Sequence, residues 1–210
     1  MPAMHPPAPA ADYLALGDSY TIGEGVDEDD RWPVQLAAAL RGRGVTLTHP
    51  HIIARTGWTT DELSAAIDQE QAQGQLQPAY RLVSLLIGVN DQYRGADVKT
   101  YALQFAALLD RAIGFAGGDP GQVLVLSIPD WSVTPFARGA GRDRAHIGEQ
   151  IDQFNAAAAA ICQHRSATWM DITDLTRMPS YSGLLVDDGL HPSGPMYRLW
   201  VERILFALAI

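Results

Sequence analysis

The chain has 210 residues, of which 47% are hydrophobic, and it carries a formal net charge of −9 at pH 7. This length suits a single α/β domain with a buried core, and the hydrophobic content argues against disorder over most of the chain. The negative charge argues against a nucleic-acid-binding surface, and no apolar run approaches the roughly 18 residues of a membrane span.

The first ten residues, MPAMHPPAPA, are rich in proline and lack the basic and apolar regions of a secretory signal peptide. We therefore expect a flexible leader at residues 1–11, followed by one domain over residues 12–210. With neither a signal peptide nor a membrane span in the sequence, the expected location is the cytoplasm.

The first part of this domain predicts two strands separated by a helix. The apolar run YLAL at residues 13–16 is typical of a buried strand. Residues 32–44 predict a helix that stops at two glycines near its end. Residues 45–54 predict a second strand, interrupted at Pro50.

A second helix and a third strand follow. Residues 59–69 predict a helix with an apolar face, and Thr59 and Glu62 have the spacing of a capping box at its start. Residues 81–87 read RLVSLLI and are apolar nearly throughout. Such a run is typical of a parallel strand that is covered on both faces.

The second half of the chain alternates in the same way. Residues 98–117 predict a long amphipathic helix, and residues 122–128 predict a fourth strand. Residues 148–165 predict another helix, and residues 167–172 a fifth strand. Residues 129–146 are the longest irregular stretch, and loops of this length are often functional or mobile.

A final helix is predicted at residues 195–210, with Ser193 as its cap. Five strands separated by helices indicate an α/β sandwich built on a parallel sheet. Open parallel sheets bind their ligands beyond the carboxyl ends of the strands. The residues that follow the strands are therefore the first candidates for a functional site.

Polar residues follow several of the predicted strands. Residues 17–19 read Gly-Asp-Ser, residues 55–58 read Arg-Thr-Gly-Trp, and residues 88–91 read Gly-Val-Asn-Asp. After the fifth strand and a loop, residues 187–191 read Asp-Asp-Gly-Leu-His. Together they supply a hydroxyl, an imidazole, carboxylates, a side-chain amide and glycine backbone, which are the groups that acyl transfer requires.

In these segments the sequence resembles the GDSL lipases and esterases, also called SGNH hydrolases. GDSYTIGEG resembles the family's nucleophile motif and gives Ser19, and ARTGWTT resembles the second motif and gives Gly57. GVND matches Gly-x-Asn-Asp and gives Asn90, while DGLH matches Asp-x-x-His and gives Asp188 and His191. Each motif alone is weak, but four in the family's order cover most of the chain.

The resemblance implies a fold and a set of roles. The fold is a three-layer α/β/α sandwich with a five-stranded parallel sheet, the flavodoxin-like arrangement of SGNH hydrolases. Ser19 is the implied nucleophile, His191 the general base and Asp188 the carboxylate that orients it. The oxyanion hole comprises the backbone N–H groups of Ser19 and Gly57 and the side-chain amide of Asn90.

Several neighbouring residues are candidates for the substrate pocket. Tyr20 stands where the family name has leucine, and its side chain flanks the nucleophile. Tyr93 and Arg94 follow the Asn90 motif and either line the pocket or only close a turn. Trp58 and Trp131 are candidates for an apolar wall, although tryptophan also commonly fills a core.

The predicted function is hydrolysis of carboxylic esters, small-molecule substrates with short acyl groups, through an acyl-enzyme. An acyltransferase or a carbohydrate O-acetyl esterase using the same triad is an alternative, and a non-catalytic binding module a distant one. Asp187 rivals Asp188 by position, but only Asp188 has the three-residue spacing to His191. The sequence lacks nucleotide-binding and metalloprotease motifs, so we expect no cofactor and no metal. It does not determine the oligomeric state.

Overall fold

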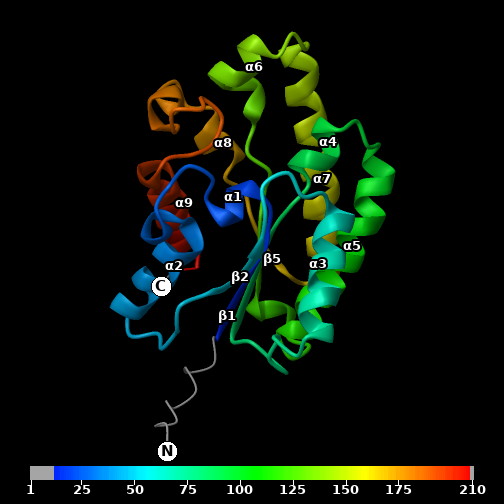
Figure 1. Ribbon diagram of the computed structural model, residues 1–210, viewed down its shortest axis with the longest axis vertical. Coiled ribbons are helices and arrows are strands. Elements are labelled where there is room, and N and C mark those ends of the chain that lie inside the picture. Colours follow the sequence, from blue (N-terminus) through cyan, green and yellow to red (C-terminus); the bar gives the residue numbers. More distant parts are fainter. Residues whose placement is uncertain (1–11, 209–210) are drawn as a thin grey trace, which may run out of the picture.

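The computed structural model describes residues 12–208, and the leader expected at residues 1–11 lies outside this range. A central sheet separates two groups of helices, so the described chain forms three layers (Figure 1). No helix within the described range is both long enough and apolar enough to cross a membrane.

The sheet has five parallel strands in the order β2-β1-β3-β4-β5, which agrees with the flavodoxin-like arrangement that the family resemblance implied. The three central strands are almost entirely buried, because helices cover both of their faces. The strands are β1 Tyr13–Gly17, β2 His51–Ala54, β3 Leu82–Leu86, β4 Val123–Leu126 and β5 Thr168–Met170.

The long helices form the two outer layers. In Figure 1, α2 and α9 lie together on one face of the sheet, and α3, α5 and α7 lie on the other. Their bounds are α2 Trp32–Gly42, α3 Thr60–Ala72, α5 Val98–Phe115, α7 Arg144–Arg165 and α9 Gly194–Ala207. The short helices are α1 Ser19–Ile22, α4 Val89–Tyr93, α6 Pro135–Gly139 and α8 Thr173–Thr176, with 3₁₀ turns η1 Glu28–Asp30, η2 Pro120–Gln122, η3 Trp131–Val133 and η4 Tyr181–Leu184.

The second strand is shorter than the sequence predicted. Residues 45–54 were expected to hold it, but the ladder to β1 begins at His51, which pairs with Leu14. Pro50 stands directly before this point and has no N–H to donate to a neighbouring strand. The other four strands agree with the prediction to within two residues at each end.

The stretch at residues 129–146 is not irregular throughout, because it contains η3, α6 and the start of α7. Each of these begins at a side-chain cap. Asp130 accepts a hydrogen bond from Ser132 N at 2.8 Å, and Thr134 Oγ1 accepts one from Ala137 N at 3.2 Å. Asp143 caps α7, which therefore starts at Arg144 rather than at the predicted residue 148.

The last helix begins one residue before the predicted start, at Gly194, with Ser193 in the N-cap position. The Ser193 hydroxyl does not cap the helix and instead donates to Leu184 O at 2.8 Å. The final two residues of the predicted helix lie outside the described range.

Candidate active site

The candidate nucleophile stands in a tight turn between β1 and α1. Gly17 is the last residue of β1, and Ser19 is the first residue of α1. A Cβ on Gly17 would lie 2.2 Å from Thr21 Oγ1 and 2.5 Å from Leu86 O. Only glycine therefore fits this turn, which sets the buried Ser19 at the carboxyl end of a central strand.

Asp18, directly before the nucleophile, is almost completely buried. Its Oδ1 accepts a hydrogen bond from Tyr20 N at 3.0 Å and caps α1, whereas Oδ2 has no partner among the described residues. Burial raises the pKa of this carboxyl to about 8, because a charged carboxylate loses its hydration there. Asp18 is therefore neutral at pH 7.

The candidate base is held by a turn that the sequence spacing predicted. Asp188 Oδ1 accepts hydrogen bonds from Leu190 N at 2.8 Å and from His191 N at 2.9 Å. Asp188 Oδ2 lies 2.6 Å from His191 Nδ1. Because an ionised carboxylate only accepts, Nδ1 carries a proton and Nε2 is left as the acceptor. Asp187 makes no such contact with the ring.

The charge on Asp188 is maintained by these contacts. Partial burial acts to raise the pKa of its carboxyl, but the hydrogen bonds from the His191 ring and from two backbone N–H groups outweigh it. The pKa of Asp188 is thus below its ordinary value. The carboxylate stays ionised at neutral pH and can stabilise a protonated imidazole.

Two further candidate donors follow the ends of β2 and β3. Gly57 follows β2 and has a φ of +87°, a conformation that favours glycine. Asn90 lies in the first turn of α4, and its Nδ2 donates to Trp58 O at 2.9 Å. An amide nitrogen has two hydrogens, so Asn90 keeps one for a ligand. Within residues 12–208, the backbone N–H groups of Ser19 and Gly57 donate to no backbone carbonyl of a turn, loop or helix cap.

Asp91, beside Asn90, has a structural role. Its carboxylate accepts hydrogen bonds from Thr60 Oγ1 at 2.6 Å and from Thr60 N at 3.1 Å. This contact joins the start of α4 to the start of α3. The loop that carries Gly57 therefore lies against the helix that carries Asn90.

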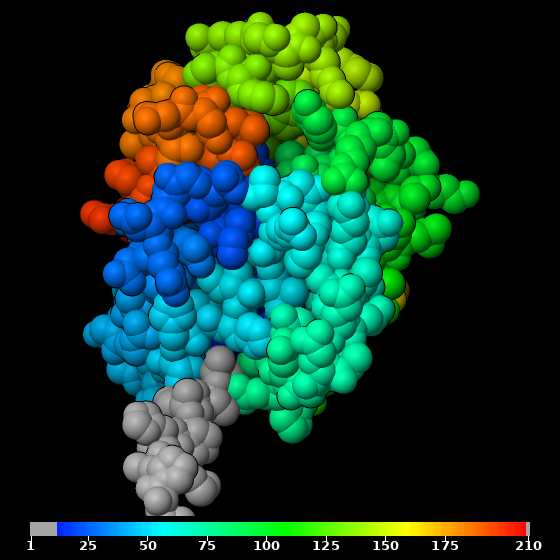
Figure 2. Space-filling model, in the orientation of Figure 1, coloured from blue at the N-terminus to red at the C-terminus, as the bar shows by residue number. Residues whose placement is uncertain are grey.

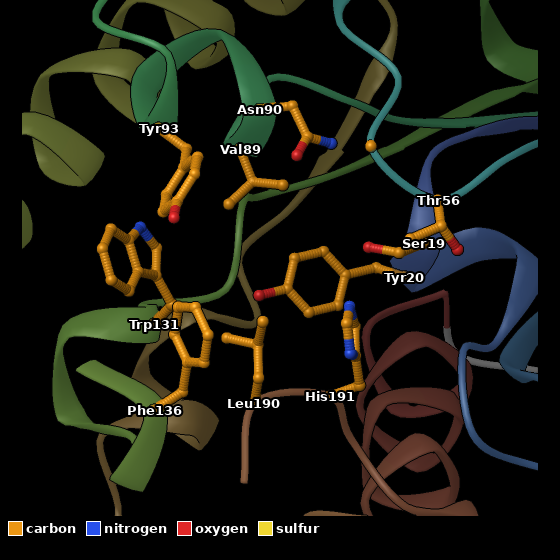
Figure 3. A pocket seen from close by; sticks show the side chains of 11 residues that line it. Ser19, Tyr20, Thr56, Val89, Asn90, Tyr93, Trp131, Phe136, Leu190 and His191 are labelled. Carbon is orange, nitrogen blue, oxygen red and sulfur yellow. The ribbon is translucent and has the colours of Figure 1, made fainter. Parts of the chain in front are cut away.

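These segments surround a pocket of about 210 Å³. In the space-filling view, the blue, cyan, yellow-green and orange segments that contribute to it meet in the upper half of the molecule (Figure 2). Figure 3 shows the Ser19 hydroxyl directed into the pocket, with the Asn90 amide and the His191 ring facing the same space. The pocket is lined by Ser19, Tyr20, Thr56, Gly57, Val89, Asn90, Tyr93, Trp131, Phe136, Leu190 and His191.

Three aromatic side chains, those of Trp131, Tyr93 and Phe136, form one wall of the pocket. Trp131 is buried, and its Nε1 donates to Gln92 Oε1 at 2.8 Å, which fixes the indole. Tyr93 and Phe136 both pack edge-on against Trp131 and are each more than one-third exposed. The wall is therefore rigid at its base and open to solvent at its mouth.

The structure brings together most of the residues that the sequence proposed. Tyr20 and Tyr93 line the pocket, whereas Trp58 and Arg94 are not among its lining residues. Trp58 is partly buried and packs against the core, and Arg94 Nη2 donates to Gly57 O at 2.6 Å. Of the two tryptophans that the sequence offered as an apolar wall, Trp131 lines the pocket and Trp58 does not.

Sequence reasoning missed four residues of the lining. Thr56, Val89 and Leu190 lie inside the motifs, next to Gly57, Asn90 and His191, so their positions were available as a signal. Phe136 comes from the stretch at residues 129–146, and no local pattern places it over the pocket. Only the path of the folded chain brings it there.

Within the described range, no hydrogen bond joins Ser19 Oγ to His191, although both side chains line the pocket. Catalytic hydrogen bonds are often long until a substrate binds. No three His, Cys, Asp or Glu side chains of residues 12–208 are close enough together to hold a metal ion.

Several solved structures are similar to this one along nearly their whole length. A protein described as a GDSL-like lipase from Parabacteroides merdae has a TM-score of 0.72 and 17% identity, with coverage of 95% of this chain and 97% of that chain. The psychrotrophic esterase EstA from a Pseudoalteromonas species has a TM-score of 0.67 and 18% identity, with 94% and 96% covered. A lipase/acylhydrolase from Enterococcus faecalis has a TM-score of 0.66 and 19% identity, with 93% and 94% covered.

At these identities the structural similarity establishes the fold. None of the curated proteins matches the sequence at a significant level. The model of the GDSL-like lipase/acylhydrolase family matches residues 15–199, which include all four motifs. The chain therefore belongs to the GDSL-like lipase/acylhydrolase family and is a hydrolase of the esterase and lipase type.

Proposed function

We propose that this protein hydrolyses carboxylic esters with small acyl groups through an acyl-enzyme on Ser19. The observation that carries the proposal is the pocket that the Ser19 hydroxyl and the His191 ring both line, with the ring held by Asp188 at 2.6 Å. A hydroxyl needs a base to become a nucleophile, and a base held in one tautomer is suited to accept its proton.

In the first step, Ser19 Oγ attacks the acyl carbon while its proton moves to His191 Nε2. The carbonyl electron pair moves to the oxygen, which the N–H groups of Ser19 and Gly57 and the Asn90 amide stabilise. The intermediate then collapses, the bond to the leaving oxygen breaks, and the alcohol leaves with the proton from His191. Asp188 stabilises the imidazolium between these events.

In the second step, water takes the place of the alcohol. His191 Nε2 accepts a proton from the water as its oxygen attacks the acyl carbon of the ester on Ser19. Collapse of this second intermediate breaks the bond to Ser19 Oγ, which takes the proton back from His191. The carboxylic acid is released, and the enzyme returns to its starting state.

The size and polarity of the pocket support a small apolar acyl group. Its volume of about 210 Å³ is below the 300–1,000 Å³ that is typical of sites for drug-sized ligands. Most of its lining is aromatic or aliphatic, and the remaining lining residues are Thr56 and the four assigned to the reaction, Ser19, Gly57, Asn90 and His191. We therefore expect acetyl to butyryl esters to be better substrates than long-chain esters.

The test is hydrolysis of p-nitrophenyl esters by the wild type and by Ser19→Ala. Loss of the nucleophile is expected to lower kcat by a factor on the order of 10⁶, as for other serine hydrolases. Ser180→Ala, at an exposed serine outside the pocket, is the matched control and should retain full activity. Full turnover by Ser19→Ala would overturn the assignment.

Two further measurements separate the proposal from its alternatives. A series of acyl chain lengths, with acetylated oligosaccharides beside it, tests substrate size. Added acceptor alcohols test whether the acyl group passes to water or to an alcohol. Labelling of Ser19 by a fluorophosphonate reports on the nucleophile without turnover, and absence of labelling would favour a non-catalytic binding module. The similar Pseudoalteromonas esterase was solved with a phosphonate inhibitor.

A further inference from the structure

Gly57, a proposed oxyanion donor, lies on a loop that is held by one contact between side chains and by two side chains that bind its backbone. Before it, Thr56 Oγ1 donates a hydrogen bond to the Glu24 carboxylate. After it, Gly57 O accepts from Arg94 Nη2 at 2.6 Å, and Trp58 O accepts from Asn90 Nδ2 at 2.9 Å. Glycine is the most flexible residue, so contacts on both sides of Gly57 restrict the directions in which its N–H can point.

Arg94 reaches the loop because of its place on the chain. Asn90 and Arg94 are four residues apart in and just after α4, so both lie on one face of that helical turn. That face is turned to the loop at residues 55–59, where the two side chains bind successive carbonyl groups. A single short helix thus supplies one oxyanion donor and holds the residue that carries another.

The Arg94 guanidinium is itself held in position. Its Nη1 donates to Glu62 Oε1 at 3.1 Å. Glu62 Oε2 accepts from Thr59 N at 2.9 Å and completes the capping box at the start of α3. The hydrogen bond from Thr59 N and then the one from Arg94 lower the pKa of Glu62, so this carboxylate stays charged.

We propose that Arg94 is a positioning residue, which holds the carbonyl of Gly57, so restrains the backbone that carries the Gly57 N–H of the oxyanion hole, and is itself held by Glu62. The inference rests on the proposed function for its effect on catalysis. Arg94 does not line the pocket, so it acts through Gly57 rather than on the substrate. Its ion pair with Glu62 is about half exposed, so it adds little to the stability of the fold.

The test compares Arg94→Met with Arg165→Met. Methionine keeps the apolar stem and removes the guanidinium. Arg165 is a matched control, because its side chain is also at least one-third exposed and paired with a carboxylate, that of Asp110 at 2.7 Å, but it lies outside the pocket. Arg94→Met is expected to lower kcat for p-nitrophenyl acetate by about 10- to 100-fold with little change in KM, because the oxyanion donor is misplaced. Arg165→Met should leave both constants unchanged.

Two further variants test the path through Glu62. Glu62→Gln keeps an acceptor for Thr59 N, since glutamine also completes a capping box, but it removes the charge facing Arg94. Its kcat should fall in the same direction and by less, and the double variant should be no worse than Arg94→Met alone. If the losses of kcat in the two single variants add up in the double variant, Glu62 does not act through Arg94 and is no part of the proposal. Arg94→Lys, which offers one point donor instead of a planar fork, should restore part of kcat.

Hydrogen–deuterium exchange of the segment at residues 55–60 gives a readout that does not depend on activity. Its protected amides include Trp58 N, which donates to Arg55 O at 3.2 Å. Faster exchange in Arg94→Met but not in Arg165→Met is the expected result. Unchanged exchange, or faster exchange with unchanged kcat, would overturn the positioning role. If the wild type cleaves no ester, the proposed function is wrong. Faster exchange in Arg94→Met would then still show that Arg94 holds the loop.

Discussion

At the scale of single residues, Asp188 organises the turn that presents His191. One carboxylate oxygen accepts two backbone N–H groups and fixes the turn, while the other faces His191 Nδ1 at 2.6 Å. The two oxygens therefore have separate tasks, one structural and one electrostatic. A substitution that preserves the first task and reverses the second can test the catalytic role proposed for Asp188.

Asp188→Asn is such a substitution. Two N–H donors require an oxygen at the Oδ1 position, so the new amide nitrogen must occupy the Oδ2 position and donate to His191 Nδ1. The ring then carries its proton on Nε2 and cannot accept one from Ser19. We expect kcat to fall by a factor on the order of 10⁴ in steady-state assays. Asp187→Asn, at the neighbouring exposed carboxylate, should retain wild-type kcat, and equal losses in both variants would contradict the assignment.

At the scale of elements, single capping side chains decide where the helices between β4 and α7 begin. The 3₁₀ turn η3 and the helices α6 and α7 each begin at an aspartate or threonine whose side chain accepts a hydrogen bond from a backbone N–H. These caps set the position of α6, which carries Phe136 to the mouth of the pocket. Caps of this kind stabilise helices by about 1 kcal/mol.

Asp143→Ala tests the cap of the longest helix. Asp143 Oδ1 accepts from Ala145 N at 3.0 Å and from His146 N at 3.3 Å. Its removal is expected to lower the free energy of unfolding by about 1 kcal/mol, measured by urea denaturation. Asp119→Ala is the control, because Asp119 caps only the three-residue turn η2 and its loss should cost less. A larger loss in the control would contradict the interpretation.

At the scale of the whole molecule, burial of Asp18 makes the stability of the fold depend on pH. The pKa of this carboxyl is about 8 in the folded protein, against an ordinary value of 3.8. Between these values the folded state holds a proton that the unfolded state has lost, so stability falls as pH rises. The loss of stability caused by the raised pKa of Asp18 is absent below about pH 4 and fully present above about pH 8.

Asp18→Asn removes this titration while keeping a side chain that can cap α1. The difference in unfolding free energy between the variant and the wild type should therefore change in favour of the variant from pH 5 to pH 8. The expected slope is at most about 1.4 kcal/mol per pH unit, measured by urea denaturation across this range. Asp91, whose pKa burial also raises, is present in both proteins and cancels in the difference. A constant difference across the range would show that Asp18 is already ionised.

The sequence by itself determined the sheet, the long helices and the motif residues of the site. Apolar runs and helical periodicity are local signals, and the residues that follow parallel strands must meet at one edge of the sheet. That is why Ser19, Asn90 and His191 line one pocket in the structure although they are far apart in the sequence.

The tertiary structure decided what depends on contacts between distant segments. The sequence could not distinguish Trp131 from Trp58 as the pocket wall, because both are large apolar residues that fill a core equally well. It also left open whether Arg94 lines the pocket or only closes a turn, whereas the folded chain directs this guanidinium to the Gly57 carbonyl. A side chain's partner is set by packing across elements, and no pattern within a single segment records it.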